Sequence, residues 1–153
     1  MRGLILFLAT GAYLGYAPVA SGTFGSLAAL PLIFVFATLP PAVQLVALGA
    51  FIGAACWLAG AAEGYLGEHD SGKIVIDEVA GFLCAAAWLD LTPSRLILAF
   101  ALFRLFDILK PPPARYFDRQ VAGGLGVVFD DVVAGLYANL ALRLLTIGNV
   151  LSS

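Results

Sequence analysis

Two long apolar segments, residues 25–39 and 42–62, dominate the first half of the chain. Pro40 and Pro41 separate them, and because proline has a fixed φ and no amide hydrogen, the pair predicts that one helix ends and the next begins there. Hydrophobic residues make up 61% of the chain and charged residues only 12%, whereas a soluble domain has about 25% charged residues. The sequence therefore predicts an integral membrane protein in which these segments form a helical hairpin.

Further apolar segments lie at residues 4–9, 79–89, 94–109 and 132–147. The segment 79–89 is shorter than the ~20 residues that a ~30 Å hydrocarbon core requires, so we expect it to be re-entrant or buried among other helices. We predict an all-α membrane bundle of five or six helices that includes such short or re-entrant segments. Residues 1–153 are expected to form a single membrane-embedded domain.

Acidic residues gather in three short segments of this apolar chain: Asp77, Glu78, Asp107, Asp130 and Asp131. A carboxylate at the centre of a membrane helix costs about 2.5–3.5 kcal/mol, and adjacent carboxylates also repel each other. A cation would remove both costs, and Mg²⁺ binds through a few carboxylates together with a substrate phosphate. The pattern predicts a Mg²⁺ site. The alternative is that each acidic pair caps the apolar helix that follows it, where the helix dipole favours negative charge.

Several residues near these acids could bind a phosphate. Arg104, Asp107 and Lys110 are spaced by three residues and therefore lie on neighbouring turns of one helix face. One possibility is that these three side chains form only ion pairs with one another. The other is that Asp107 binds a metal while Arg104 and Lys110 hold phosphate oxygens. Glycine-rich residues 21–26 and 123–126 could offer backbone N–H groups to an anion or could form simple turns. The candidate phosphate ligands are Thr23, Ser26, Arg104, Lys110, Gly123 and Gly124.

The charge distribution predicts an orientation and excludes one class of partner. If the Pro40–Pro41 turn lies on one side of the membrane, the acidic segments fall together on the other side. That side carries Lys110, Arg115 and Arg119, so the positive-inside rule predicts that it is cytoplasmic. A net charge of −2 without any basic run indicates no nucleic-acid partner. The sequence leaves the oligomeric state open.

Four motifs resemble the successive signatures of the phosphatidylglycerophosphatase A family, in the same order and spacing. They are GTFGS at residues 22–26, IVIDEVAG at 74–81, FRLFDILKP at 103–111 and GGLGVVFDDVVAG at 123–135. The resemblance covers about residues 15–138. Pro112 and Val128 depart from it, since the family more often has an aromatic residue and a methionine there.

The resemblance implies a multi-pass enzyme of the bacterial inner membrane whose active site faces the cytoplasm. Such an enzyme hydrolyses the terminal phosphate monoester of phosphatidylglycerophosphate in a Mg²⁺-dependent reaction, giving phosphatidylglycerol and inorganic phosphate for glycerophospholipid biosynthesis. The five acids would hold one or two Mg²⁺ ions, unless Asp130 or Glu78 acts as general base, and no organic cofactor is expected.

Two other functions compete with this interpretation. A membrane cation channel or transporter could line its path with the acidic residues, although that function predicts acids spread across the membrane depth and not gathered at one face. A CDP-alcohol phosphotransferase also uses clustered aspartates and Mg²⁺, but its DGxxAR signature is missing from this sequence.

Overall fold

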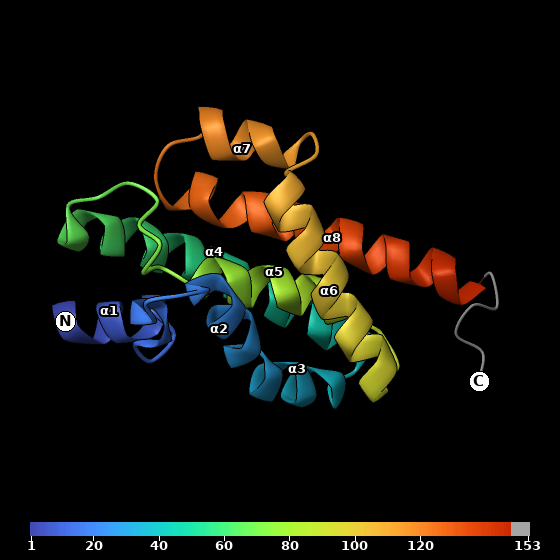
Figure 1. Cartoon of the computed structure of the whole chain (residues 1–153). Coiled ribbons are helices and arrows are strands. Elements are labelled where there is room, and N and C mark those ends of the chain that lie inside the picture. The colour runs from blue at the N-terminus through green and yellow to red at the C-terminus, as the bar shows by residue number, and fades with distance from the viewer. Residues whose placement is uncertain (148–153) are drawn as a thin grey trace.

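The computed structural model describes residues 1–147, and within this range the chain forms only helices and the segments that join them (Figure 1). The α-helices are α1 Arg2–Ala9, α2 Ser21–Ala28, α3 Leu30–Ala37, α4 Pro41–Leu66, α5 Ile76–Ala86, α6 Pro93–Leu109, α7 Ala114–Gln120 and α8 Gly124–Ile147, with a 3₁₀ helix at Leu14–Tyr16. The all-α prediction is therefore confirmed for these residues. Because α2 and α3 form one run, Ser21–Ala37, the structure contains seven helical runs against the five or six predicted. The helix that the prediction missed is α7.

Prolines and capping residues fix the ends of the long helices. α4 begins at Pro41, at the predicted turn, and ends at Leu66, four residues beyond the predicted segment. The residue that caps it, Gly67, has a φ of 71°, in the left-handed region that favours glycine. α6 begins at Pro93, after the Thr92 hydroxyl, which accepts a hydrogen bond from the Arg95 amide at 3.3 Å. The bounds of α6 agree with the predicted segment 94–109.

α5 is the buried centre of the molecule. Each of its residues except Glu78 is buried, and it packs chiefly against α8 and also against α4, α2 and α6 (Figure 1). The internal position predicted for residues 79–89 is confirmed for residues 79–86, whereas Trp88, beyond the end of α5, is exposed. α5 begins three residues earlier than predicted, at Ile76, so that Asp77 and Glu78 belong to its first turn.

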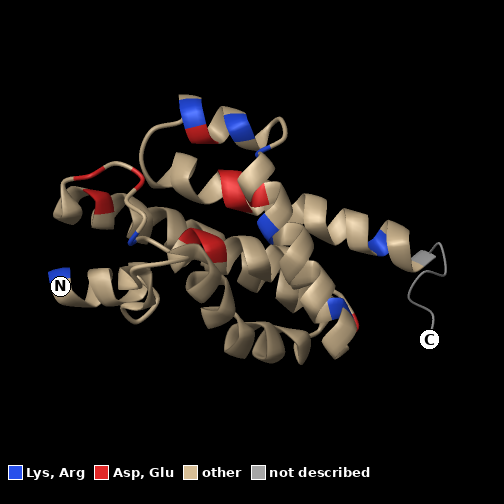
Figure 2. Ribbon diagram, viewed as in Figure 1, with Lys and Arg blue, Asp and Glu red and all other residues tan. Residues whose placement is uncertain are grey.

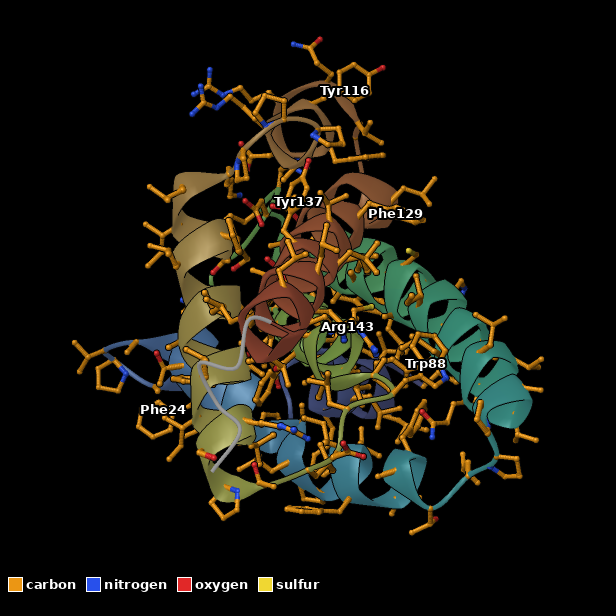
Figure 3. The ribbon with its side chains drawn as sticks, turned by 90° about the vertical axis from the view of Figure 1, so that its right-hand side faces the viewer. Phe24, Trp88, Tyr116, Phe129, Tyr137 and Arg143 are labelled. Atoms are coloured by element: carbon orange, nitrogen blue, oxygen red, sulfur yellow. The ribbon has the colours of Figure 1, made fainter. Side chains whose placement is uncertain are left out.

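Polar side chains of α8 complete the hydrogen bonding at the buried C-terminal end of α5. The Asn139 amide donates to the carbonyl oxygens of Ala85 and Ala87, at 2.9 Å in each case. The Arg143 guanidinium donates to the Trp88 carbonyl oxygen at 3.0 Å and to Asn139 Oδ1 at 2.7 Å (Figure 3). Because helix C-termini expose unpaired carbonyl groups and favour a cation, these contacts let α5 end inside the bundle.

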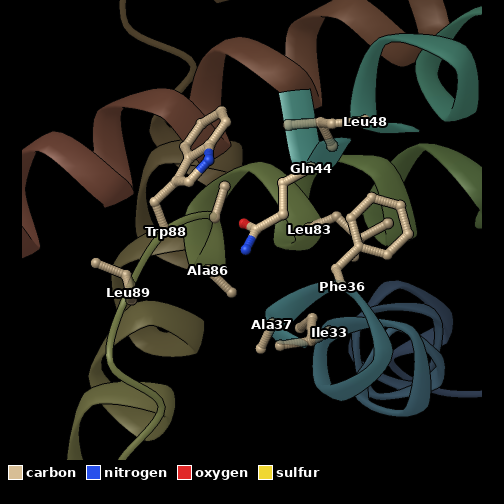
Figure 4. A pocket seen from close by; sticks show the side chains of 10 residues that line it. Ile33, Phe36, Ala37, Gln44, Leu48, Leu83, Ala86, Trp88 and Leu89 are labelled. Atoms are coloured by element: carbon tan, nitrogen blue, oxygen red, sulfur yellow. The ribbon is translucent and has the colours of Figure 1, made fainter. Parts of the chain in front are cut away.

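The predicted hairpin of residues 25–39 and 42–62 is wrong. After the turn at Pro40, α3 packs on α5, whereas α4 packs on α8, α1 and α5, so α3 and α4 do not run along each other. A small pocket of about 40 Å³ lies between α3, α4 and α5, with the Gln44 side chain among its mostly apolar lining (Figure 4). The Gln44 amide donates to the Leu39 carbonyl oxygen at 2.9 Å, which holds the turn together.

Both glycine-rich segments are more helical than predicted. Residues 21–26 do not precede a helix but form the first turns of α2, which begins at Ser21. The last helix, predicted over residues 132–147, begins at Gly124, and the connection before it contains α7. Phe117 of α7 stacks on Phe129 of α8 with ring centroids 5.4 Å apart, which holds α7 against α8.

Two helices of the described chain, α4 and α8, are long and apolar enough to cross a membrane. Other helices cover little of α4, and its side chains Leu45, Val46 and Trp57 are exposed. Large apolar side chains exposed along one helix are expected on a surface that faces lipid. These features support membrane association, while the number of crossings and the orientation stay predictions.

Candidate active site

The first turn of α5 places two carboxylates inside the bundle. Asp77 and Glu78 follow Val75, which provides no side-chain cap, so the free N–H groups of the helix start lie beside negative charge. Asp77 is only 8% exposed. Burial raises the pKa of Asp77 well above its ordinary value, and the charge of Glu78 raises it further.

A close crossing of α5 and α8 brings a third carboxylate to this turn. A Cβ atom at Gly135 would overlap the carbonyl oxygen of Gly81, and one at Gly81 would lie 2.7 Å from the carbonyl oxygen of Asp131. Only glycine permits so close an approach of two helix backbones. Asp77 lies one turn before Gly81, and Asp131 one turn before Gly135, so both acids stand on the same side of the crossing.

Asp77, Glu78 and Asp131 together form a three-carboxylate cluster. Each contributes one oxygen to a group whose atoms all lie within 4.8 Å of one another. Asp77 Oδ1 and Glu78 Oε2 are buried without a hydrogen-bond partner. Buried acceptors are normally paired, and neighbouring carboxylates repel each other. Three such oxygens fit a hard divalent cation, which prefers oxygen ligands.

α6 adds a cation and a fourth acid beside this cluster. Arg104 Nη1 lies 2.7 Å from Asp107 Oδ2, across the predicted three-residue spacing, and both side chains are largely shielded from solvent. Burial raises the pKa of Glu78, the charge of Asp107 raises it further, and the charge of Arg104 opposes this rise. Both α6 side chains therefore lie near Glu78. Arg104 Nη1 is buried and makes no well-aligned hydrogen bond, which leaves a donor beside the cluster.

The first turn of α2 closes over the same side chains. A Cβ atom at Gly22 would overlap Glu78 Oε1 and would lie 2.8 Å from Arg104 Nη1. Thr23 follows in this turn and is half-buried. Ser26 is fully buried, and its hydroxyl donates to the Gly22 carbonyl oxygen at 2.8 Å. Within this segment, Gly22 is the residue that meets the acids, whereas Ser26 is occupied by its own helix.

Asp130 is held by other partners than the three-carboxylate cluster, and its Oδ1 accepts a hydrogen bond from the Asp131 amide at 2.9 Å. Asp130 Oδ2 accepts a hydrogen bond from Lys110 Nζ at 2.7 Å, and the Lys110 ammonium also pairs with Asp118 of α7. Burial opposes the charge of Lys110, but its hydrogen bonds to Asp118 and Asp130 outweigh this effect and raise its pKa. These three side chains tie together the end of α6, α7 and the start of α8. Sequence reasoning did not identify Asp118, since three prolines separate it from the helix that carries Lys110.

Gly123 and Gly124 lie at the start of α8, where the described contacts of Gly124 serve packing. Gly123 has a φ of 73°, in the left-handed region that favours glycine. A Cβ atom at Gly124 would overlap the Cys56 carbonyl oxygen and would lie 2.5 Å from the Gly60 amide nitrogen, both in α4. The binding of a phosphate by Gly123 and Gly124 stays a prediction.

Charged residues are concentrated in one half of the molecule. Figure 2 shows them at the start of α5, on α7, in the first half of α8 and in the connection between α4 and α5. The other half contains Asp90 and Arg95, which form an ion pair, and Arg143, which caps α5. The arrangement agrees with the expectation that the acidic segments gather on one side.

Comparison with known proteins gives a consistent family assignment. The family model described as phosphatidylglycerophosphatase A matches residues 7–146. The chain is 40% identical to phosphatidylglycerophosphatase A of Haemophilus influenzae, over 88% of this chain and 83% of the relative. It is 39% identical to phosphatidylglycerophosphatase A of Escherichia coli, over 84% of this chain and 76% of the relative. A Bacteroides thetaiotaomicron protein, provisionally named a phosphatidylinositol-3-phosphatase, is also 39% identical, over 88% of this chain and 89% of the relative. No solved structure matches the chain.

Proposed function

Because this chain belongs to the phosphatidylglycerophosphatase A family and is a phosphatase, we propose that it hydrolyses the terminal phosphate monoester of phosphatidylglycerophosphate. The products are phosphatidylglycerol and inorganic phosphate. The observation that carries this proposal is the buried three-carboxylate cluster, whose unpartnered oxygens lie beside the Arg104 guanidinium. Metal-dependent hydrolysis of a phosphate monoester uses this combination of a cation site and an anion-binding donor.

The cluster fits the Mg²⁺ ion expected from the sequence. Asp77, Glu78 and Asp131 would hold the ion, and Asp107, ion-paired to Arg104, lies next to them. All these donors are carboxylate oxygens, the ligand type that Mg²⁺ prefers. When bound, Mg²⁺ would neutralise charge on the phosphate and activate water as the nucleophile.

The side chains around the cluster would orient the phosphate and move protons. Arg104 presents a planar, permanently charged fork that suits phosphate oxygens, and its Nη1, ion-paired with Asp107 Oδ2 at 2.7 Å, lies beside the cluster. Glu78 lies between Arg104 and Gly22 and can accept a proton from the attacking water if it does not bind the metal. The contacts of Lys110 with Asp130 and Asp118 tie the end of α6 to α8 and α7. We also propose that Lys110 and Asp130 take part directly in the reaction.

The proposed setting is the bacterial inner membrane, with the site on the cytoplasmic side. α4 and α8 would cross the bilayer. Lys110, Arg115 and Arg119 lie on the same side as the acids, which the positive-inside rule makes cytoplasmic.

Phosphate release by the purified protein in detergent tests the proposed function. We expect turnover of phosphatidylglycerophosphate that exceeds turnover of phosphatidylinositol 3-phosphate, the type of lipid named for the Bacteroides relative. A cation channel or transporter would release no phosphate but would carry ions across liposomes. The absence of phosphate release from either lipid by folded protein would refute the proposal.

Removal of divalent cations is predicted to stop the reaction. In excess EDTA, phosphate release should fall at least about 10-fold, because the cation's contribution to stabilising the transition state is several kcal/mol. Added Mg²⁺ should restore the rate, whereas Ca²⁺ should restore less, since it prefers more ligands at longer distances. An unchanged rate after EDTA treatment and dialysis would contradict metal dependence.

Gly22→Ala is predicted to impair activity while leaving the fold intact. The new Cβ atom would overlap Glu78 Oε1 and crowd Arg104 Nη1, but both are ends of flexible side chains that can move aside. Because small displacements of catalytic groups are costly, we expect kcat to fall about 10- to 100-fold with little change in thermal unfolding. Gly49→Ala, where a Cβ atom would meet nothing within 4 Å, is the matched control. Equal kcat values for Gly22→Ala and Gly49→Ala would show that Gly22 does not position the side chains of the site.

A further inference from the structure

An apolar groove lies on the surface beside the site. It has a volume of about 180 Å³ and is lined by Leu27, Leu30, Phe82, Leu96, Ile97 and Phe100. Leu27 and Leu30 belong to the α2–α3 run, Phe82 to α5, and the other three to α6. α2 and α6 both pack on α5 but make few contacts with each other, so α5 forms the floor between two walls.

The floor of the groove is rigid and its rim is open. Phe82 is 1% exposed and meets the Phe100 ring edge-to-face with centroids 5.6 Å apart. At the rim, Leu27 is 43% and Ile97 is 70% exposed. No polar side chain lines the groove, so a bound group gains by leaving water and by close packing against the apolar side chains.

The groove continues directly from the proposed phosphate site along the same three helices. Phe82 lies one turn after Glu78 on α5, and Phe100 lies one turn before Arg104 on α6. On α2, Leu27 comes a little more than one turn after Gly22. One turn corresponds to about 5.4 Å, so the apolar walls begin where the Gly22, Glu78 and Arg104 cluster ends.

We propose that this groove, which we call the acyl groove, holds a fatty acyl chain of the lipid substrate while the phosphate lies at Arg104 and the carboxylates. The inference rests on the proposed function and specifies how its substrate is bound. A glycerophospholipid carries a charged head group next to long hydrocarbon chains, and the molecule offers the same sequence of polar and apolar surface. The exposed rim lets a chain enter sideways from the bilayer.

The pocket between α3, α4 and α5 is a poorer place for this chain. It is lined by Leu83, Ala86 and the polar Gln44 near the C-terminal end of α5 (Figure 4). Ala86 comes eight residues after Glu78, which places this pocket about 12 Å along the helix from the carboxylates. At that end of α5, Asn139 and Arg143 donate hydrogen bonds to the last carbonyl groups.

Chain-length dependence tests the acyl groove. Ile97→Trp puts a bulky ring at the exposed rim, and Leu27→Trp does the same on the opposite wall. For the dioleoyl substrate we expect kcat/KM to fall about 10-fold, the effect of losing roughly two buried methylene groups. The dihexanoyl substrate, whose chains are too short to depend on the groove, should be hydrolysed at the wild-type rate. Val46→Trp, at a site that is 72% exposed on α4, is the matched control and should change neither rate.

Photolabelling gives a readout that requires no turnover. Dioleoyl-type phosphatidylglycerophosphate with a diazirine in one acyl chain would be crosslinked to the wild-type protein, and the labelled peptides identified by mass spectrometry. Label on the α2–α3 run and α6 supports the acyl groove. Label confined to other helices, or to the α3–α4–α5 pocket, overturns the proposal. An equal loss of kcat/KM for the dioleoyl and dihexanoyl substrates in folded Ile97→Trp and Leu27→Trp also overturns it. If the wild-type protein releases no phosphate from either substrate, the proposed function is wrong. The crosslinks then test by themselves whether the acyl groove binds an acyl chain.

Discussion

Asp77→Asn is expected to reduce phosphate release from phosphatidylglycerophosphate by about 10³-fold, because it removes one of three proposed cation ligands and several kcal/mol of transition-state stabilisation. Asp77 is the most enclosed acid on α5, and it faces Asp131 across the α5–α8 crossing. The amide has nearly the same shape as the carboxylate but lacks its charge. The rate at saturating substrate, measured across a Mg²⁺ titration, should stay low at every Mg²⁺ concentration.

The same substitution should not destabilise the protein. In the absence of metal, three carboxylates with oxygens within 4.8 Å repel one another, and replacing one of them by an amide relieves that repulsion. We expect an unchanged or raised thermal midpoint in EDTA. Asp90→Asn is the matched control, because the Asp90 side chain is 91% exposed and pairs only with Arg95 at the other end of the molecule. Near-normal activity of folded Asp77→Asn would remove Asp77 from the site.

The acidic pairs show which part of the candidate site the sequence predicts. The rarity of charge in an apolar chain predicted that the acidic segments lie together, and Asp77, Glu78 and Asp131 do so. Adjacency was a poorer guide, because neighbouring residues on a helix point about 100° apart. Asp131 therefore faces α5, whereas Asp130 faces Lys110. Whether Asp130 also binds a cation stays a prediction.

The sequence predicts the role of the glycine-rich motifs only in part. A glycine cluster predicts close backbone approach, but it does not say whether the approaching group is a ligand or another helix. At Gly22 the neighbours are Glu78 and Arg104, and the binding of an anion by this segment stays a prediction. At Gly124 the neighbour is the backbone of α4, a contact between segments more than 60 residues apart that no local pattern encodes.

The starts of α4 and α6 followed from local signals, whereas the packing partners of the helices did not. Pro41, Pro93 and the Thr92 cap set the starts of α4 and α6 where the sequence placed them. The hairpin prediction was wrong because α3 packs on α5 and α4 packs chiefly on α8, and these tertiary contacts are not encoded in a local pattern. The acyl groove likewise combines residues of α2, α3, α5 and α6, which only the folded chain brings together.

Gly135→Ala is predicted to damage both the fold and the reaction. The added Cβ atom would overlap the Gly81 carbonyl oxygen, far inside the 3.0 Å that real Cβ contacts respect, and neither backbone can move independently of its helix. α5 and α8 must separate, at a cost of about 1–3 kcal/mol typical of overpacking. Because the crossing holds Asp131 beside Asp77, a shift of about 1 Å should lower kcat roughly 10²-fold. Thermal unfolding in detergent and phosphate release measure the two effects.

Gly53→Ala separates this crowding from the general effect of replacing a helical glycine. Gly53 lies in the middle of α4, where a Cβ atom would meet nothing within 4 Å. Alanine is the better helix former by about 1 kcal/mol, so this variant should be at least as stable as wild type and fully active. Gly81→Ala, whose Cβ atom would lie 2.5 Å from Phe103 Cε2, should resemble Gly135→Ala, since it opens the same crossing. Wild-type activity in Gly135→Ala would mean that Asp131 does not depend on the crossing for its position, and the three-carboxylate cluster would lose its structural basis.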